Sequence, residues 1–199
     1  MPGGPSTAGA LAGRQGIMAG NPVLKQKLSK KKGAICREWL RLIAETYEAR
    51  DFLTRARDRF ANPVGFTISR ETEAIVDELC QGNDPERLSS ALANIIRIRA
   101  VQDLRPSEAL SFVFHLKKAA RDALAGEPVD EQTFEELRAL DHSVDDMALL
   151  ALDIYSHFRD RIHQLKLNEI KAERERAFVI LERSQGIRPN GGRQVSGTG

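Results

Sequence analysis

The sequence contains few of the residues that catalysis, metal binding or membrane insertion requires. Its 199 residues include two cysteines and four histidines, and these show no Cys/His spacing of a metal site. No run of about 18 apolar residues occurs, so we expect no membrane-spanning helix. The start, MPGGPSTAGALAGRQG, lacks the basic residues and apolar block of a secretory signal. These absences predict a cytoplasmic protein whose Cys36 and Cys80 stay reduced.

Enzymatic motifs are also missing. The sequence has no HExxH pair, no nucleophile elbow and no phosphate-binding loop. Adjacent acids such as Asp145 and Asp146 point apart on a helix and therefore do not share a proton. We expect a protein that is not an enzyme, and we assign no catalytic residue, no metal ligand and no cofactor.

The net charge of +2 hides an uneven distribution. The first 37 residues carry seven lysines and arginines and no acid, so the rest of the chain has a net charge of −5. The stretch KQKLSKKK, residues 25–32, is therefore a candidate for binding nucleic acid or an anionic membrane. No aromatic residue interleaves its lysines to stack on bases. We favour a solvated, lysine-rich start of a helix and therefore do not expect a nucleic-acid partner.

Glycine and proline mark the limits of the fold. Eleven of the 15 glycines lie before residue 22 or after residue 185, which predicts disordered tails at 1–22 and 187–199 around one helical domain at 23–186. The prolines between the tails punctuate helices, and no useful alternating pattern predicts a strand. The sequence predicts an all-α fold with helices at 24–48, 51–60, 69–81, 85–104, 106–125, 131–140 and 143–183.

The long helix at 143–183, which Ser143 and Asp146 are expected to cap, carries two apolar stripes. The first, expected to be buried, consists of Met147, Leu150, Ala151, Ile154, Phe158, Ile162 and Leu165. The second has the a/d spacing of a coiled coil on a different face. It consists of Leu167, Ile170, Arg174, Ala177 and Leu181, which we call the seam and assign to a partner, with a homodimer as the favoured case.

A charged stretch within otherwise apolar helices predicts a structural joint. Arg99 and Asp103 are four residues apart on one helix face. Arg97 and Gln102 are expected to hydrogen-bond to the loop that contains Asn62, Pro63 and Gly65. His115 falls on the polar face of its helix, where we expect it to be solvated rather than to bind haem or metal.

Four segments carry a resemblance to a known family. They are REWLRLIAETY at 37–47, DRFANPVGFTIS at 58–69, IIRIRAVQDLRPSEALSFVFHLKK at 95–118 and ALLALDIYSHFRDRI at 148–162. Together they resemble the RsbRD N-terminal domain family, which is similar to the sensor domain of RsbR-type stressosome proteins. The resemblance implies a globin-like fold without haem, dimerisation partly through the last helix, and a protein partner in a regulatory or respiratory context.

The resemblance covers only the input half of those proteins. In RsbR-type proteins the last helix leads into a STAS domain, whereas this sequence ends in SQGIRPNGGRQVSGTG. We therefore expect a stand-alone regulatory or sensor module that acts through protein contacts. One alternative is a small-molecule or redox sensor with a pocket among Trp39, Tyr47, Phe112, Tyr155 and Phe158. Binding of nucleic acid or membrane through the basic N-terminal segment is the second alternative.

Overall fold

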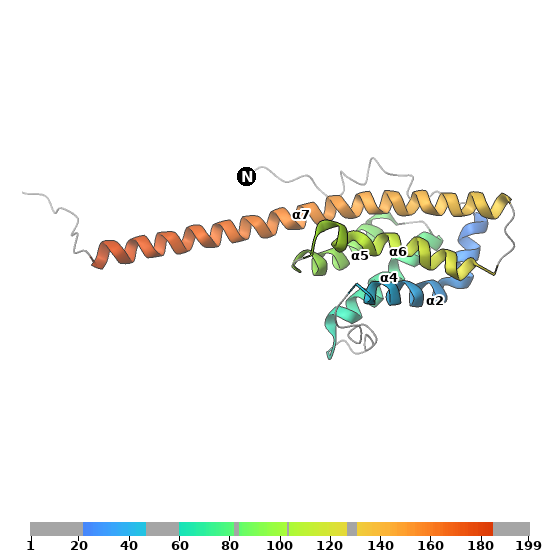
Figure 1. Cartoon of the computed structure of the whole chain (residues 1–199), viewed down its shortest axis with the longest axis horizontal. Coiled ribbons are helices and arrows are strands. Elements are labelled where there is room, and N and C mark those ends of the chain that lie inside the picture. The colour runs from blue at the N-terminus through green and yellow to red at the C-terminus, as the bar shows by residue number, and fades with distance from the viewer. Residues whose placement is uncertain (1–21, 47–59, 82–83, 103, 127–130, 185–199) are drawn as a thin grey trace, which may run out of the picture. The chain divides into compact units, whose positions relative to one another are not determined.

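The structure, a computed structural model, describes residues 22–46, 60–81, 84–102, 104–126 and 131–184. Over these residues the protein is all-α, as predicted, with no strand, and it ends in one long helix (Figure 1). The helices are α2 (Pro22–Ala44), α4 (Pro63–Gln81), α5 (Pro85–Ala100), α6 (Pro106–Leu124) and α7 (Glu131–Ser184). Both predicted tails, apart from Pro22, and nearly all of the predicted helix at 51–60 lie outside the described residues. The globin-like character and the domain limits stay predictions.

Proline opens four of these helices. Pro22, Pro63, Pro85 and Pro106 are each the first residue of their helix, where the missing N–H costs nothing and the fixed φ is already helical. Side chains then cap the exposed N–H groups. Asn62 Oδ1 accepts a hydrogen bond from the backbone N–H of Gly65 at 2.7 Å, and Asp84 Oδ1 accepts one from the N–H of Arg87 at 3.0 Å.

Several predicted helix boundaries were wrong. The helices predicted to end at 48 and 104 end earlier, α2 at Ala44 and α5 at Ala100. The prediction treated Pro63 as part of a break and began the helix at 69, but α4 begins at Pro63 because Asn62 caps it. The break predicted at 141–142 is also absent, since α7 is continuous. Ser143 is inside that helix, where its Oγ donates to the carbonyl oxygen of Ala139 at 3.0 Å instead of capping a helix start.

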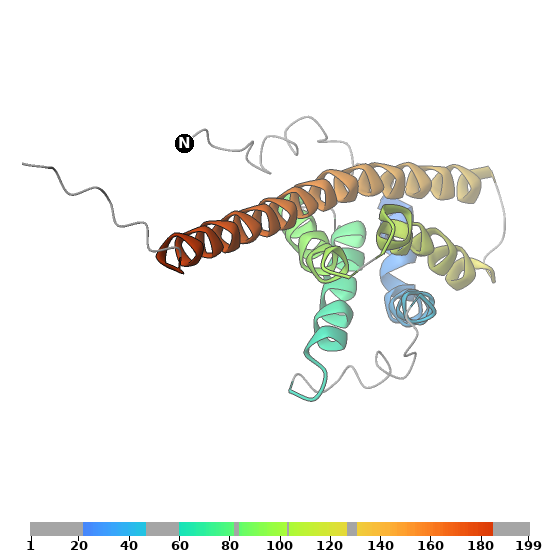
Figure 2. The same ribbon diagram turned by 60° about the vertical axis from the view of Figure 1, so that its left-hand side comes forward.

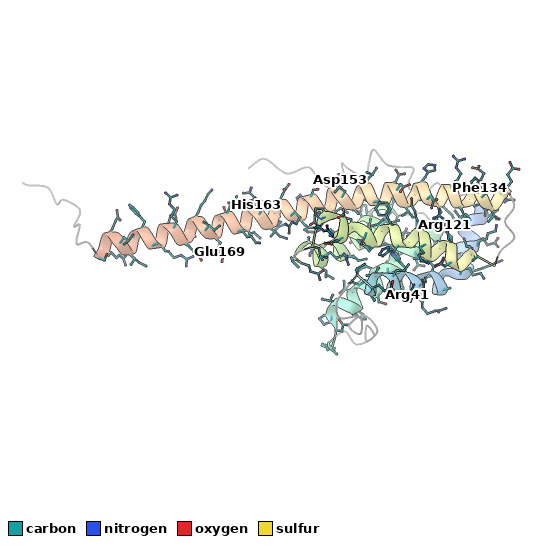
Figure 3. All side chains as sticks on the ribbon, viewed as in Figure 1. Arg41, Arg121, Phe134, Asp153, His163 and Glu169 are labelled. Carbon is teal, nitrogen blue, oxygen red and sulfur yellow. The ribbon has the colours of Figure 1, made fainter. Side chains whose placement is uncertain are left out.

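The chain divides into two compact units, residues 1–159 and residues 160–199. In the first unit α2 packs on α4 and α6, and α4 packs on α5, so that α4 and α5 lie side by side (Figure 2). The first part of α7 covers this core with Val144, Met147 and Ala151, none of which is measurably exposed. Its outer side carries Phe134 and Asp153 (Figure 3).

Ion pairs join α7 to α6 and to α2. Lys117 Nζ on α6 lies 2.7 Å from Asp145 Oδ1, and Arg121, also on α6, pairs with Asp141. The Lys27 ammonium on α2 lies 3.0 Å from the carboxylate of Glu136, whose side chain is 1% exposed. The described part of the second unit is the remainder of α7, residues 160–184.

Candidate functional site

The seam residues all lie in the second unit, and all are exposed. Leu167, Ile170 and Leu181 are 38%, 60% and 55% exposed, and Arg174 and Ala177 are exposed as well. Because the segment is helical throughout, the spacing of three and four places these five residues on one side of it. The seam is therefore a row of accessible apolar side chains with one arginine at its centre.

Apolar residues that the sequence reasoning did not assign to the seam also lie exposed on α7. Phe178, Val179 and Ile180 are 62%, 44% and 65% exposed, and four consecutive apolar residues at 178–181 extend around the whole helix. This run was visible in the sequence and should have been added to the candidate surface. It widens the apolar surface beyond one stripe.

Leu165 was predicted to be buried and is 63% exposed. The preceding residues of its stripe are covered by the core of the first unit: Leu150 and Ile154 are buried and Phe158 is half-buried. Leu165 lies beyond Arg159, in the unit whose described part is a single helix. One helix has no neighbour in that unit to cover its side chains, so periodicity alone did not predict burial correctly.

Arg99 is the most buried charged residue of the predicted joint, with 1% exposure. Its Nε donates to the carbonyl oxygen of Ala109 at 2.7 Å, its Nη2 to the carbonyl oxygen of Glu108 at 2.8 Å, and its Nη1 to Thr46 Oγ1 at 3.2 Å. The guanidinium also lies 5.7 Å from the ring centroid of Phe112. Arg99 thus connects the end of α5 to the first turn of α6 and to the segment that follows α2.

The other joint residues have contacts in different places. Arg97 is exposed and lies over the ring of Phe158 at 5.3 Å. Asn62, with Pro63 and Gly65, forms the start of α4. Gln102 is half-buried, and its backbone N–H donates to the carbonyl oxygen of Arg99 at 3.3 Å. Asp103 lies outside the described residues, and the predicted pairing of Arg97 and Gln102 with residues 62–65 stays a prediction.

His115 is not the solvated polar-face residue that was predicted. The side chain is half-buried, and its Nδ1 is inaccessible and has no hydrogen-bond partner among the described residues. Burial lowers the pKa of His115, and the positive charge of Arg99 lowers it further. Helical periodicity gave the wrong environment because it takes no account of residues from other parts of the chain. Among these is Glu45, just after α2, which acts to raise the pKa of the imidazole.

The residues predicted to line a pocket are packed in part against one another. Trp39 and Phe112 are both fully buried, and their rings stack with centroids 6.3 Å apart and planes inclined by 15°. Tyr155 is 3% exposed, and its hydroxyl is buried without a hydrogen-bond partner in the described part of the chain. Tyr47 lies outside the described residues, so a pocket bounded by all five side chains stays a prediction.

The basic N-terminal segment is less free than a solvated helix start. Lys27 donates to Thr133 Oγ1 at 3.2 Å and to the buried Glu136 at 3.0 Å. The ammonium of Lys32 lies 2.6 Å from Asp77 Oδ1, and this contact raises the pKa of Lys32. These lysines are held by acids of the same chain, which leaves fewer positive charges for phosphate groups.

The described residues offer little for metal or thiol chemistry. They include no group of three or more His, Cys, Asp and Glu side chains suited to hold a metal ion. Cys36 and Cys80 are buried, and burial raises the pKa of each thiol to about 11, which leaves both protonated at neutral pH. Within the described helices, none is long and apolar enough to cross a membrane.

Comparison with known proteins gives one result. The family model described as RsbT co-antagonist protein rsbRD N-terminal domain matches residues 33–170. No curated protein and no solved structure matches the chain. The matched residues include all of α4, α5 and α6, residues 33–44 of α2 and the part of α7 that ends at Ile170.

Proposed function

Since the chain belongs to the rsbRD N-terminal domain family, we propose that it is a non-enzymatic regulatory module that works by binding proteins and forms a homodimer through the seam. The observation that supports this proposal is the row of exposed apolar residues on the second unit, with Leu167 at its start and Leu181 at its end. The family is that of a stressosome-type sensor domain, for which protein partners are expected.

Exposure of this apolar surface is the physical reason for a partner. Ile170, Phe178 and Ile180 are each at least 60% exposed, and exposed apolar groups gathered on one element indicate a contact site. Covering each such side chain contributes about 1.5–3 kcal/mol when it becomes fully buried. The a/d spacing is the pattern that two helices use to bury such residues together.

The second unit is the part best suited to transmit a signal. α7 begins among the packed helices of the first unit and continues as the seam, so one element belongs to both. Within the first unit, the buried hydrogen bonds of Arg99 hold the end of α5 to the first turn of α6. We infer that the first unit receives the signal and that α7 presents the surface that a partner reads.

Light scattering of the purified full chain over a range of concentrations tests the dimer. We expect a dimer for the unchanged protein and a helical monomer for the double variant Leu167→Glu, Leu181→Glu. The matched control is Leu149→Glu, Leu152→Glu, which changes two leucines of α7 in the first unit that are 51% and 44% exposed. A chain that stays monomeric at all concentrations contradicts the proposal, and so does a double variant that stays dimeric.

The second candidate function is a small-molecule sensor. The buried, unpartnered hydroxyl of Tyr155 favours it, because a buried polar group without a hydrogen bond costs about 1–3 kcal/mol and a ligand can supply the missing partner. A small molecule that raises the melting temperature of the unchanged protein, but not that of a Tyr155→Phe variant, supports this role. If no compound raises the melting temperature of the unchanged protein above its effect on the Tyr155→Phe variant, the sensor role has no support.

A further inference from the structure

The last turn of α5 has two sides, and each side contacts a different part of the first unit. A helix turns by about 100° per residue, so the side chains of Arg97 and Arg99 leave this turn in nearly opposite directions. Arg99 is buried and donates to the first turn of α6 and to Thr46. Arg97 is exposed and lies over the ring of Phe158 on α7. One turn of helix therefore contacts α6, the segment after α2, and α7.

The end of α5 also provides a carbonyl oxygen that α7 uses. The last four carbonyl groups of a helix have no partner within it, and the carbonyl of Ala100 is one of them because α5 ends there. Arg159 Nη1 donates to this oxygen at 3.3 Å, and a cation is favourable at this end of the helix dipole. Since Phe158 and Arg159 are adjacent, the last turn of α5 holds α7 at two successive residues.

These two contacts lie where α7 leaves the packed helices. Arg159 is the last residue of the first unit. The seam begins at Leu167, eight residues further along the same helix, which corresponds to about 12 Å at a rise of about 1.5 Å per residue. The described part of the second unit contains no element besides α7 to hold the intervening segment. The contacts of Phe158 and Arg159 therefore decide how firmly that segment is held.

We propose that the last turn of α5, residues 97–100, couples the first unit to the seam. While Arg99 holds this turn against α6 and Thr46, the turn holds α7 at Phe158 and Arg159. Displacement of the turn removes both contacts with α7 together. The segment that leads to the seam then gains freedom, and a second copy must order it on binding, which lowers the affinity. This inference rests on the proposed homodimer and adds the contact by which the first unit regulates it.

Hydrogen exchange of the backbone amides of residues 158–166 tests the coupling without the dimer. The full chain carries Leu167→Glu and Leu181→Glu in this experiment, so that the seam cannot pair. Adding Arg99→Ala should raise the exchange rate of these amides by roughly three- to tenfold, because the loss of its hydrogen bonds loosens the hold on α7. Arg159→Ala removes one contact with α7 directly and should give a similar rise.

Matched variants separate the coupling from a general loss of stability. Trp39→Phe weakens the contact of α2 with α6 and should leave the exchange of residues 158–166 unchanged. Arg161→Ala removes an exposed arginine two residues after Arg159 and should also have no effect. When Arg99→Ala and Arg159→Ala are combined, the exchange rate should rise little beyond that of either variant alone, because both changes loosen the same hold on α7.

A milder variant keeps the test valid if Arg99→Ala does not fold. Thr46→Val removes the exposed hydroxyl that accepts from Arg99 Nη1 at 3.2 Å, and it should raise the exchange of residues 158–166 by a smaller factor. Unchanged exchange in Arg99→Ala, or in Thr46→Val where Arg99→Ala does not fold, overturns the coupling. An equal rise in Trp39→Phe also overturns it, and so does a double variant in which the two effects multiply.

Dimerisation is measured separately, by sedimentation equilibrium of the full chain with its seam intact. Arg159→Ala should raise the dissociation constant by roughly three- to tenfold, because a smaller fraction of the chains is ready to pair. Arg161→Ala should leave the constant unchanged. Equal constants for Arg159→Ala and the unchanged chain overturn the regulation of the seam. A monomeric unchanged chain whose exchange behaves as expected overturns the homodimer and supports the hold of α5 on α7.

Discussion

The indole Nε1 of Trp39 on α2 donates to the carbonyl oxygen of Phe112 on α6 at 2.7 Å, while the two rings stack on each other. A single pair of residues thus connects the two helices by both a polar and an apolar contact. The sequence suggested these aromatics as the wall of a ligand pocket. In the structure they form the contact between α2 and α6.

Replacing Trp39 by Phe tests the polar part of this contact. Trp39 is fully buried, so the change leaves the Phe112 carbonyl without its indole donor and removes part of the stacked area. We expect the free energy of unfolding to fall by about 1–3 kcal/mol, measured by urea denaturation. Phe114→Leu is the control, since Phe114 is 49% exposed and should change stability little. Equal midpoints for the two variants contradict the assignment.

Arg99 is predicted to stabilise the first unit through its buried hydrogen bonds. Arg99→Ala removes the donors to the Ala109 and Glu108 carbonyl oxygens, and we expect a loss of about 1–3 kcal/mol in the free energy of unfolding. Arg99→Lys should not recover it, because one ammonium cannot replace the planar fork of donors. The exposed Arg97 is the comparison, for which alanine should cost below about 1 kcal/mol. An unchanged melting temperature for Arg99→Ala makes this residue a candidate for function instead.

His115 predicts a pH dependence of stability. Because burial and Arg99 lower its pKa below the ordinary value of 6.5, the unfolded chain binds a proton at this residue more readily than the folded chain. Stability is therefore fully present above pH 6.5 and decreases as the pH falls from 6.5 to the pKa of the folded state. Urea denaturation at pH 7.5 and 5.5 should show this decrease. A His115→Phe variant that keeps the full decrease refutes the assignment to this residue.

Gly65 is required by the cap of α4. A Cβ at this position would lie against the side-chain amide of Asn62, 2.9 Å from its Cγ. Gly65→Ala should therefore disturb the cap and cost about 1 kcal/mol. In the Asn62→Ala background the same change should cost less, since the amide is gone; a full cost there contradicts the argument. Gly33→Ala is expected to stabilise α2 by about 0.5–1 kcal/mol, because a Cβ at this position has room: the nearest group would be Arg37 Nη1 at 3.5 Å.

The sequence predicted the helices best where proline and periodicity agree. Pro85 and Pro106 open α5 and α6 at the predicted residues, because a proline at the first helical position acts locally and needs no distant contact. The start of α4 was missed because Pro63 was read as a break without the cap from Asn62. The false cap at Ser143 arose since a hydroxyl inside a helix can also bond the preceding turn.

In the candidate site, too, local features could be predicted from the sequence and features set by distant contacts could not. The a/d spacing of Leu167, Ile170 and Leu181 is local, so the sequence alone identified the seam as apolar and on one side of a helix. Long-range packing decided which charged and aromatic residues are buried. A prediction that treats each helix separately missed the surroundings of Arg99 and His115. The two residues that follow α2, Glu45 and Thr46, contribute to them, since Arg99 donates to Thr46 and Glu45 acts on the pKa of His115.

The sequence by itself thus determined the helical class, the proline-marked starts and the spacing of the seam, because all three depend on neighbours within a few residues. Only the tertiary structure decided that the indole of Trp39 donates to the carbonyl oxygen of Phe112, that Arg99 is buried, and that Leu165 is exposed. Burial is a property of how separate helices meet, and no periodicity along one helix records which other element covers it.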